Sequence, residues 1–165
     1  MDRHFDDDLK KFHANLAHLA SLTEQAIENS VMALKNQDTQ LAKSVIENDK
    51  TIDELENMIE EQGVDLLACY QPMAIDLRYI TTGININAEL ERIADMAVNI
   101  CYKVIDIADK PLLKPLIDIP KLSEIARKMV KQAIDSFITR NETLAKEVIA
   151  LEPEADNLRN LITKE

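Results

Sequence analysis

Apolar residues recur every three or four positions along most of the chain, which is the spacing of one buried face on an α-helix. From Phe5 to Leu34 the period is unbroken and predicts one long amphipathic helix. The same pattern resumes after each break and predicts an all-α protein. Five helices are expected, over about residues 5–35, 41–70, 73–107, 122–137 and 144–162.

Capping residues and prolines divide these helices. Residues 36–39 favour a helix break and a new N-terminus, and Pro72 suits the first turn of a third helix after a chain reversal. Three prolines within ten residues, Pro111, Pro115 and Pro120, exclude a regular helix there. We therefore predict an antiparallel three-helix unit over 1–108, a linker over 109–120 and two further helices over 121–165.

The second unit repeats the first. Sliding the chain by 103 residues places Leu41, Ala42, Lys43, Val45 and Ile46 on Leu144, Ala145, Lys146, Val148 and Ile149. The counterpart of the third helix has not begun where the sequence ends. Two apolar stripes without a third helix are poorly sheltered, so we expect truncation, self-association into a homo-oligomer, or completion by another chain.

Composition and charge limit the classes of function that this chain can have. The chain has 165 residues, 46% of them hydrophobic, and a formal net charge of −11. This charge argues against a nucleic-acid surface and suits metal cations or a basic partner. The acidic N-terminus lacks the apolar core of a signal peptide, and no apolar run reaches the length of a membrane span. A cytoplasmic protein without membrane insertion is expected.

Pairs of acids four residues apart mark a candidate metal centre. Glu91 and Asp95 share one face of the third helix, and Asp49 and Asp53 share one face of the second. An antiparallel hairpin that reverses near Pro72 places Asp49 level with Asp95, and Asp53 level with Glu91. At 4 Å two like charges repel by roughly 4 kcal/mol at an effective dielectric near 20, so four converging carboxylates call for a cation.

The repeat adds a further acidic pair. Asp49 and Asp53 fall on Glu152 and Asp156, so the corresponding helix of the second unit keeps acids at the same two places. Ligation by oxygen alone suits magnesium, calcium, manganese or ferric iron better than copper or zinc. The alternative interpretation of all these acids is a solvated acidic face.

Nothing in the sequence indicates catalysis. There is no Glu-x-x-His pair, Gly-rich phosphate loop or nucleophile arrangement, so no catalytic residue and no enzyme activity is predicted. His13 and His18 fall on the polar side of the first helix and are expected at the solvated surface. Cys69 and Cys101 have no ligand spacing and are expected as small core residues.

Two segments of the third helix resemble the signature of the PhoU family of phosphate-transport regulators. They are Gln-Pro-Met-Ala-Ile-Asp-Leu-Arg-Tyr-Ile at 71–80 and Glu-Leu-Glu-Arg-Ile-Ala-Asp-Met-Ala at 89–97. The resemblance covers the whole chain and implies two three-helix repeats of the PhoU-like, spectrin-repeat-like kind. This sequence has Ala94 and Met96 where Gly and His or Tyr are common, and it lacks the final helix with the fourth acidic motif.

The resemblance implies a metal-binding regulator. The pairs at 49/53, 91/95 and 152/156 match the family's acid-x-x-x-Asp motif, which implies bound multinuclear iron or other metals such as manganese, zinc or magnesium. It also implies docking to the ATPase subunit of the phosphate ABC transporter and to a PhoR-type sensor kinase. By that docking, a family member represses phosphate uptake and starvation signalling.

A partner contact and two rival functions complete the expectations. Asp76, Arg78 and Tyr79, near the start of the third helix, are a candidate partner contact or else an ordinary polar cluster. The rivals to a regulator are a carboxylate-bridged metal oxidase and a purely structural dimerisation bundle whose acids serve solubility.

Overall fold

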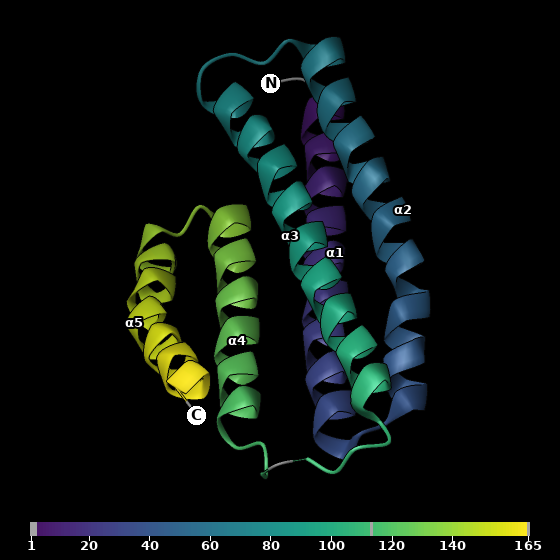
Figure 1. Ribbon diagram of the computed structural model, residues 1–165. Helices are drawn as coiled ribbons and strands as arrows, with labels where there is room; N and C mark the ends of the chain where they lie inside the picture. Colours follow the sequence, from purple (N-terminus) through teal and green to yellow (C-terminus); the bar gives the residue numbers. More distant parts are fainter. Residues whose placement is uncertain (1–2, 113, 165) are drawn as a thin grey trace.

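The computed structural model describes residues 3–112 and 114–164, and in this part of the chain every regular element is a helix. The predicted all-α architecture of five long helices is therefore confirmed (Figure 1). The helices are α1 (Arg3–Asn36), α2 (Thr39–Tyr70), α3 (Ile75–Ile107), α4 (Asp118–Thr139) and α5 (Glu142–Lys164).

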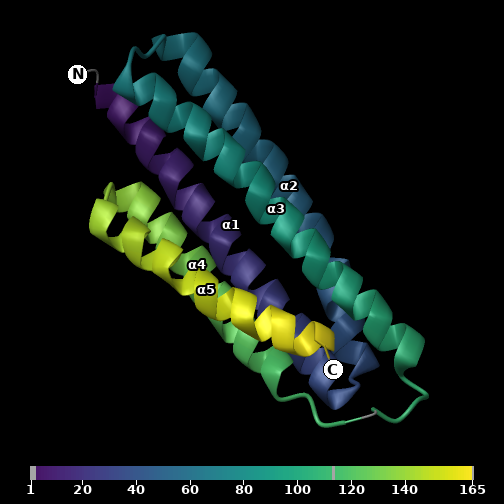
Figure 2. The same cartoon turned by 60° about the vertical axis from the view of Figure 1, so that its left-hand side comes forward.

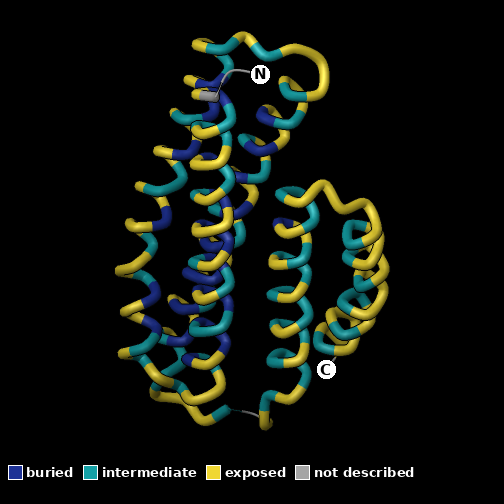
Figure 3. Tube along the Cα trace, turned by 180° about the vertical axis from the view of Figure 1, so that it is seen from behind, coloured by how far each residue is buried: buried dark blue, intermediate teal, exposed yellow. Residues whose placement is uncertain are grey.

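Helices α1, α2 and α3 form an antiparallel bundle in which each helix packs against the other two (Figures 1 and 2). The apolar stripes predicted from the sequence meet along its axis, where most of the buried positions in Figure 3 lie. Burying a large apolar side chain contributes about 1.5–3 kcal/mol, so this shared core is the main source of stability. Its largest fully buried apolar side chains are Phe12, Leu16, Leu19, Ile52, Ile59, Ile80 and Val104.

The breaks between helices follow the sequence with two boundary differences. The Asp38 side chain caps α2 by accepting hydrogen bonds from two backbone N–H groups, each at 3.0 Å. Helix α3 begins at Ile75 rather than Met73, because Ala74 has a φ of 50° and so lies outside the helical region. Helix α4 begins at Asp118, within the expected linker, because Pro120 lies in its first turn, where a missing N–H costs nothing.

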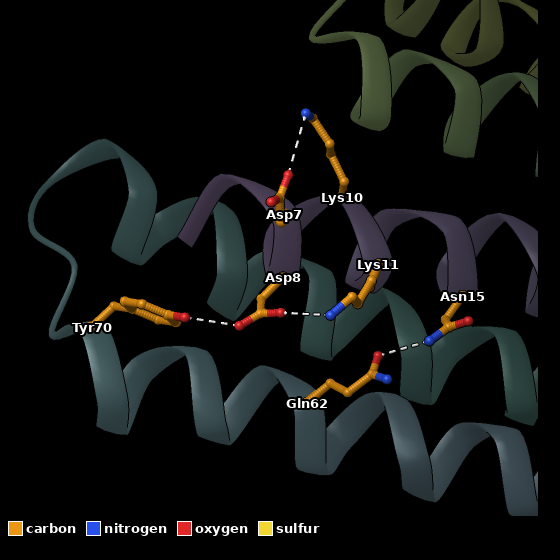
Figure 4. Close-up of polar contacts among 7 residues, drawn as sticks. All are labelled: Asp7, Asp8, Lys10, Lys11, Asn15, Gln62 and Tyr70. Atoms are coloured by element: carbon orange, nitrogen blue, oxygen red, sulfur yellow. Dashed lines mark hydrogen bonds and ion pairs between the residues drawn. The ribbon is translucent and has the colours of Figure 1, made fainter. Parts of the chain in front are cut away.

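Polar contacts fix the packing of α1 on α2 at the end of the bundle near the N-terminus (Figure 4). The carboxylate of Asp8 accepts hydrogen bonds from Lys11 on its own helix at 2.9 Å and from the Tyr70 hydroxyl on α2 at 2.8 Å. One step further along, the Asn15 side chain donates to Gln62 at 2.9 Å. These bonds hold α1 and α2 in one register.

The second unit is a hairpin of α4 and α5 attached through α4. Helix α4 packs on α1, and α5 packs on α4 (Figure 1). One ion pair joins Arg127 of α4 to Glu28 of α1 at 2.9 Å. Among the residues of this hairpin, which are all described, only Ile134 is buried.

Four side chains, His13, Tyr79, Phe137 and Arg140, form what we call the aromatic clamp between the two units. The Tyr79 ring stacks on Phe137 with centroids 4.4 Å apart, and the Arg140 guanidinium lies 4.4 Å above the Tyr79 ring. The Tyr79 hydroxyl donates a hydrogen bond to the Phe137 carbonyl at 2.8 Å. Arg140 also lies 3.7 Å from Asp76, so the clamp joins α1, α3 and the end of α4.

The clamp overturns one expectation about polar residues. His13 is half-buried, with its ring 5.1 Å from that of Tyr79, so the prediction of a solvated histidine is wrong. Burial, and then the nearby charge of Arg140, lower the pKa of His13 below its ordinary value. Of the two cysteines, Cys101 is buried as expected, whereas Cys69 is exposed.

Two buried glycines allow the helices to approach closely. A Cβ added at Gly83 would lie 2.5 Å from the Phe12 ring, and one added at Gly63 would lie 2.5 Å from the side chain of Ile84. Phe12 is fully buried, whereas Ile84 is only half-buried. Gly83 is therefore the tighter of the two positions.

Replacing Gly83 with Ala is expected to lower the free energy of unfolding by about 1 kcal/mol. Overpacking costs about 1–3 kcal/mol and outweighs the gain of up to ~1 kcal/mol from helix propensity. The matched comparison is Gly63→Ala, which should cost less because Ile84 is only half-buried. Urea unfolding measures both, and a Gly83→Ala variant at least as stable as the native chain would contradict this account.

Candidate metal centre

The antiparallel packing of α2 on α3 brings the predicted acids to one side of the helix pair. Its register is fixed by Asn87, which is fully buried on α3 and donates from Nδ2 to the backbone carbonyl of Glu56 at 2.9 Å and to its Oε1 at 3.0 Å. Glu91 lies one helical turn further along α3 from Asn87 and is half-buried, as is Asp49. Asp53 and Asp95 are exposed.

Electrostatic repulsion connects these acids across the two helices. Burial raises the pKa of Asp49, and repulsion from Asp53 and Asp95 raises it further. Burial also raises the pKa of Glu91, and four carboxylates add to this shift: Asp95, Asp53, Glu56 and Asp49. Asp53 and Glu91 therefore lie on the same side of the bundle, and acids from both helices share one region of negative potential.

Glu56 and Asn87 are residues of this region that the sequence analysis does not propose as ligands. The pKa of Glu56 is raised by burial, then by repulsion from Glu60 and Asp53. The Asn87 Oδ1 is buried and accepts no hydrogen bond from the described residues. The hairpin register about Pro72 that pairs Asp49 with Asp95 places Glu56 opposite Ala88, the neighbour of Asn87, so this level alignment could have drawn attention to both residues.

The chemistry of the donors fits a hard cation. The side chains offer carboxylate oxygens and one unpartnered amide oxygen, which are the ligands that Mg²⁺, Mn²⁺ and ferric iron prefer. Among the residues that the structure describes, no three His, Cys, Asp or Glu side chains are already arranged to hold an ion. These residues therefore match a hard cation in their charge and in the type of donor atom that they offer.

The remaining predicted site residues lie elsewhere. Glu152 and Asp156 are on α5, which packs on α4, so they do not join the acids of α2 and α3. Glu152 is exposed, and Asp156 lies 3.1 Å from Arg159. In the candidate partner contact, Tyr79 is part of the aromatic clamp and Asp76 lies near its Arg140, whereas Arg78 is exposed.

Comparison with known proteins places this arrangement in a family. Residues 16–104 and 119–165 match the PhoU domain, which is most of the chain. The chain belongs to the PhoU family. The PhoU homolog of Aquifex aeolicus is 38% identical over 158 residues, covering 96% of this chain and 72% of that protein. The PhoU homolog of Rhizobium meliloti is 33% identical and covers 98% and 68%.

Solved PhoU structures share the fold. The crystal structure of PhoU from Pseudomonas aeruginosa has a TM-score of 0.89 at 29% identity, covering 97% of this chain and 79% of that one. PhoU from Streptococcus pneumoniae has a TM-score of 0.88 at 21% identity, covering 97% and 75%, and supports the fold alone. The family resemblance and PhoU-like fold expected from the sequence are confirmed.

Family membership also bears on activity. PhoU proteins are accessory and regulatory proteins of phosphate transport, which confirms the prediction that this chain is not an enzyme. The oxidase alternative is thereby removed. None of the helices in the described ranges, 3–112 and 114–164, has the length and apolar character to span a membrane.

The PhoU match has two parts along the chain. Its second part begins at residue 119 and its first at residue 16, the same offset of 103 residues that aligns the two units. The first part covers α1 from Leu16 onward, α2 and most of α3, whereas the second covers nearly all of α4 and α5.

The acid region of this PhoU protein should make its stability depend on pH. The pKa values of Asp49 and Glu91 are raised above 3.8 and 4.5 in the folded state, so the folded chain binds more protons than the unfolded chain just above those values. In the presence of a chelator, the contribution of these two acids to the free energy of unfolding should therefore rise as the pH falls from neutrality toward about 4.5.

A paired substitution isolates this effect. Asp49→Asn with Glu91→Gln should make the free energy of unfolding depend less on pH and should raise it at pH 7, as measured by urea unfolding. The control, Glu47→Gln with Glu89→Gln, removes one exposed acid from each of the same helices. If both pairs gave the same slope, the repulsion across α2 and α3 would not be its source.

Proposed function

We propose that this chain is a cytoplasmic, metal-binding regulator that represses phosphate uptake and phosphate-starvation signalling. It would act by docking to the ATPase subunit of the phosphate ABC transporter and to a PhoR-type sensor kinase. The Aquifex relative is named a phosphate-specific transport system accessory protein, and the Streptococcus structure a phosphate transport system regulatory protein. Those names support the phosphate-related part of the proposal.

The observation that carries the metal part is the mutual repulsion of carboxylates on α2 and α3. Asp49, Asp53, Glu91 and Asp95 are the proposed ligands, and Glu56 lies close enough to raise the pKa of Glu91 further. A bound iron, manganese, magnesium or zinc ion would neutralise this charge. Because the acids come from both helices, the ion would also tie α2 to α3.

The acidic pair on α5 has a lesser part in the proposal. Glu152 and Asp156 repeat the spacing of Asp49 and Asp53, but among the described helices α5 packs on α4 alone, so these acids do not face those of α2 and α3. Metal binding by the chain alone is assigned to the first unit.

Metal addition should raise the melting temperature of the chelator-treated protein, because a ligand that binds only the folded state stabilises it. Glu91→Ala with Asp95→Ala should abolish both this rise and the heat of binding seen by calorimetry with iron, manganese, magnesium or zinc. The control, Glu89→Ala with Asp106→Ala, makes the same charge change on the same helix. If neither metal nor chelator changed the melting temperature of the native protein, the result would favour the interpretation as a purely structural bundle.

Regulation is tested separately in a bacterium whose own PhoU homolog has been deleted. Expressing this chain should lower the activity of a phosphate-starvation reporter at high phosphate. Capture of the purified transporter ATPase by the purified chain tests the docking step directly. A reporter that stays fully active although the chain accumulates in folded form would contradict the regulatory part, whatever the outcome for metal.

A further inference from the structure

At one end of the acid region, Asn87 of α3 contacts Glu56 of α2. The Asn87 side chain is fully buried, and its Nδ2 donates to the backbone carbonyl of Glu56 at 2.9 Å and to its Oε1 at 3.0 Å. One turn away in the same direction along the helix pair lie Asp53 and Glu91, and the other two predicted ligands follow after another turn. The contact between Asn87 and Glu56 therefore continues the row of predicted ligands.

The two hydrogen bonds fix the direction in which the Asn87 amide points. Its NH2 group uses both hydrogens on Glu56, and turning the amide over would set Oδ1 against two acceptor oxygens. Oδ1 is thus held away from them, where it is buried and accepts no hydrogen bond from the described residues. A buried carbonyl oxygen without a donor lowers stability, and an apolar side chain would avoid that loss. The amide therefore points to a role besides packing.

The same contact holds the Glu56 carboxylate in place. A glutamate side chain on a helix surface has many rotamers, and a ligand that must order it loses binding free energy. Glu56 is half-buried and already fixed through Oε1, whereas its Oε2 takes no part in the contact with Asn87. One oxygen of Glu56 is thus positioned by the fold, and the other is left for a further partner.

Glu56 also lies within the negative potential of the predicted ligands. It is one of the four carboxylates that raise the pKa of Glu91, and Asp53 in turn raises the pKa of Glu56. The next acid along α2, Glu60, is exposed and is not among the groups that raise the pKa of Glu91. The charge that a cation would neutralise therefore includes Glu56 and ends before Glu60.

We infer that Glu56 is a fifth carboxylate ligand of the metal centre and that Asn87 is the residue that positions it. This inference rests on the metal binding proposed above and adds to its ligands. Asn87 would act through Glu56, by fixing the carboxylate before the ion binds, and its Oδ1 would accept a hydrogen bond from water that the ion retains. Outer hydrogen bonds of this kind typically change metal affinity by about ten- to a hundredfold.

Manganese is the probe for Glu56, titrated by calorimetry into the chelator-treated protein. Glu56→Gln keeps an oxygen that can accept the bond from Asn87 but removes the charge, so the helix register stays while Mn²⁺ affinity should fall about tenfold or more. The matched control is Glu60→Gln, which makes the same change one turn further along α2 and should leave the affinity nearly unchanged. Equal affinities of the two variants would overturn the ligand role of Glu56.

A double-mutant cycle tests Asn87, at a temperature where circular dichroism shows every variant folded. Asn87→Ala should weaken Mn²⁺ binding about tenfold or more in the native chain, but much less in the Glu56→Gln chain, which has no carboxylate to position. Additive losses would overturn the positioning role, because Asn87 would then act only through the packing of the helices. Thr23→Val removes another buried hydrogen bond of α3, to the Leu90 carbonyl at 3.3 Å, and should leave the affinity unchanged.

The results distinguish this inference from the proposed function. If Glu91→Ala with Asp95→Ala abolished Mn²⁺ binding but Glu56→Gln left it intact, the metal centre would stand and the inference would be wrong. If the native chain bound no metal, both would be wrong.

Discussion

The packing of α2 against α3 is the contact on which the rest of the molecule depends. Its apolar side buries Ile52, Ile59 and Ile80, and its register is held by the two hydrogen bonds that Asn87 donates to Glu56. Such a bond contributes about 0.5–1.5 kcal/mol, but a buried amide left without it would cost more. The same register brings the acids of both helices together, so the contact that stabilises the bundle also creates its repulsive region.

Much of this arrangement could be predicted because it depends on short-range rules. A helical period of apolar residues defines the helices, and a reversal near Pro72 fixes which acids of α2 and α3 lie level. The observed helix boundaries differ from the predicted ones where local backbone geometry sets the first residue of a helix. Ala74 has a positive φ, so α3 begins after it, and Pro120 is accommodated in the first turn of α4.

His13 and Asn87 illustrate what periodicity could not supply. His13 lies on the side of α1 that faces the second unit, where Phe137 and Arg140 join Tyr79 of α3 in surrounding it. Asn87 is polar yet fully buried, so a pattern that assigns polar residues to the surface places it wrongly. Both positions depend on contacts between residues more than 30 positions apart, which no local window of the sequence contains.

The aromatic clamp gives the attachment of the second unit its own dependence on acidity. The pKa of His13 is lowered from 6.5 in the folded chain, so the unfolded chain takes up a proton first as the pH falls. The clamp therefore loses stability below about pH 6.5, where a charged imidazole would face the Arg140 guanidinium and the half-buried ring of Tyr79. Mild acid thus weakens the contact between the two units, whereas it reduces the repulsion between the carboxylates of the first unit. Protonation therefore has opposite effects at these two places in one chain.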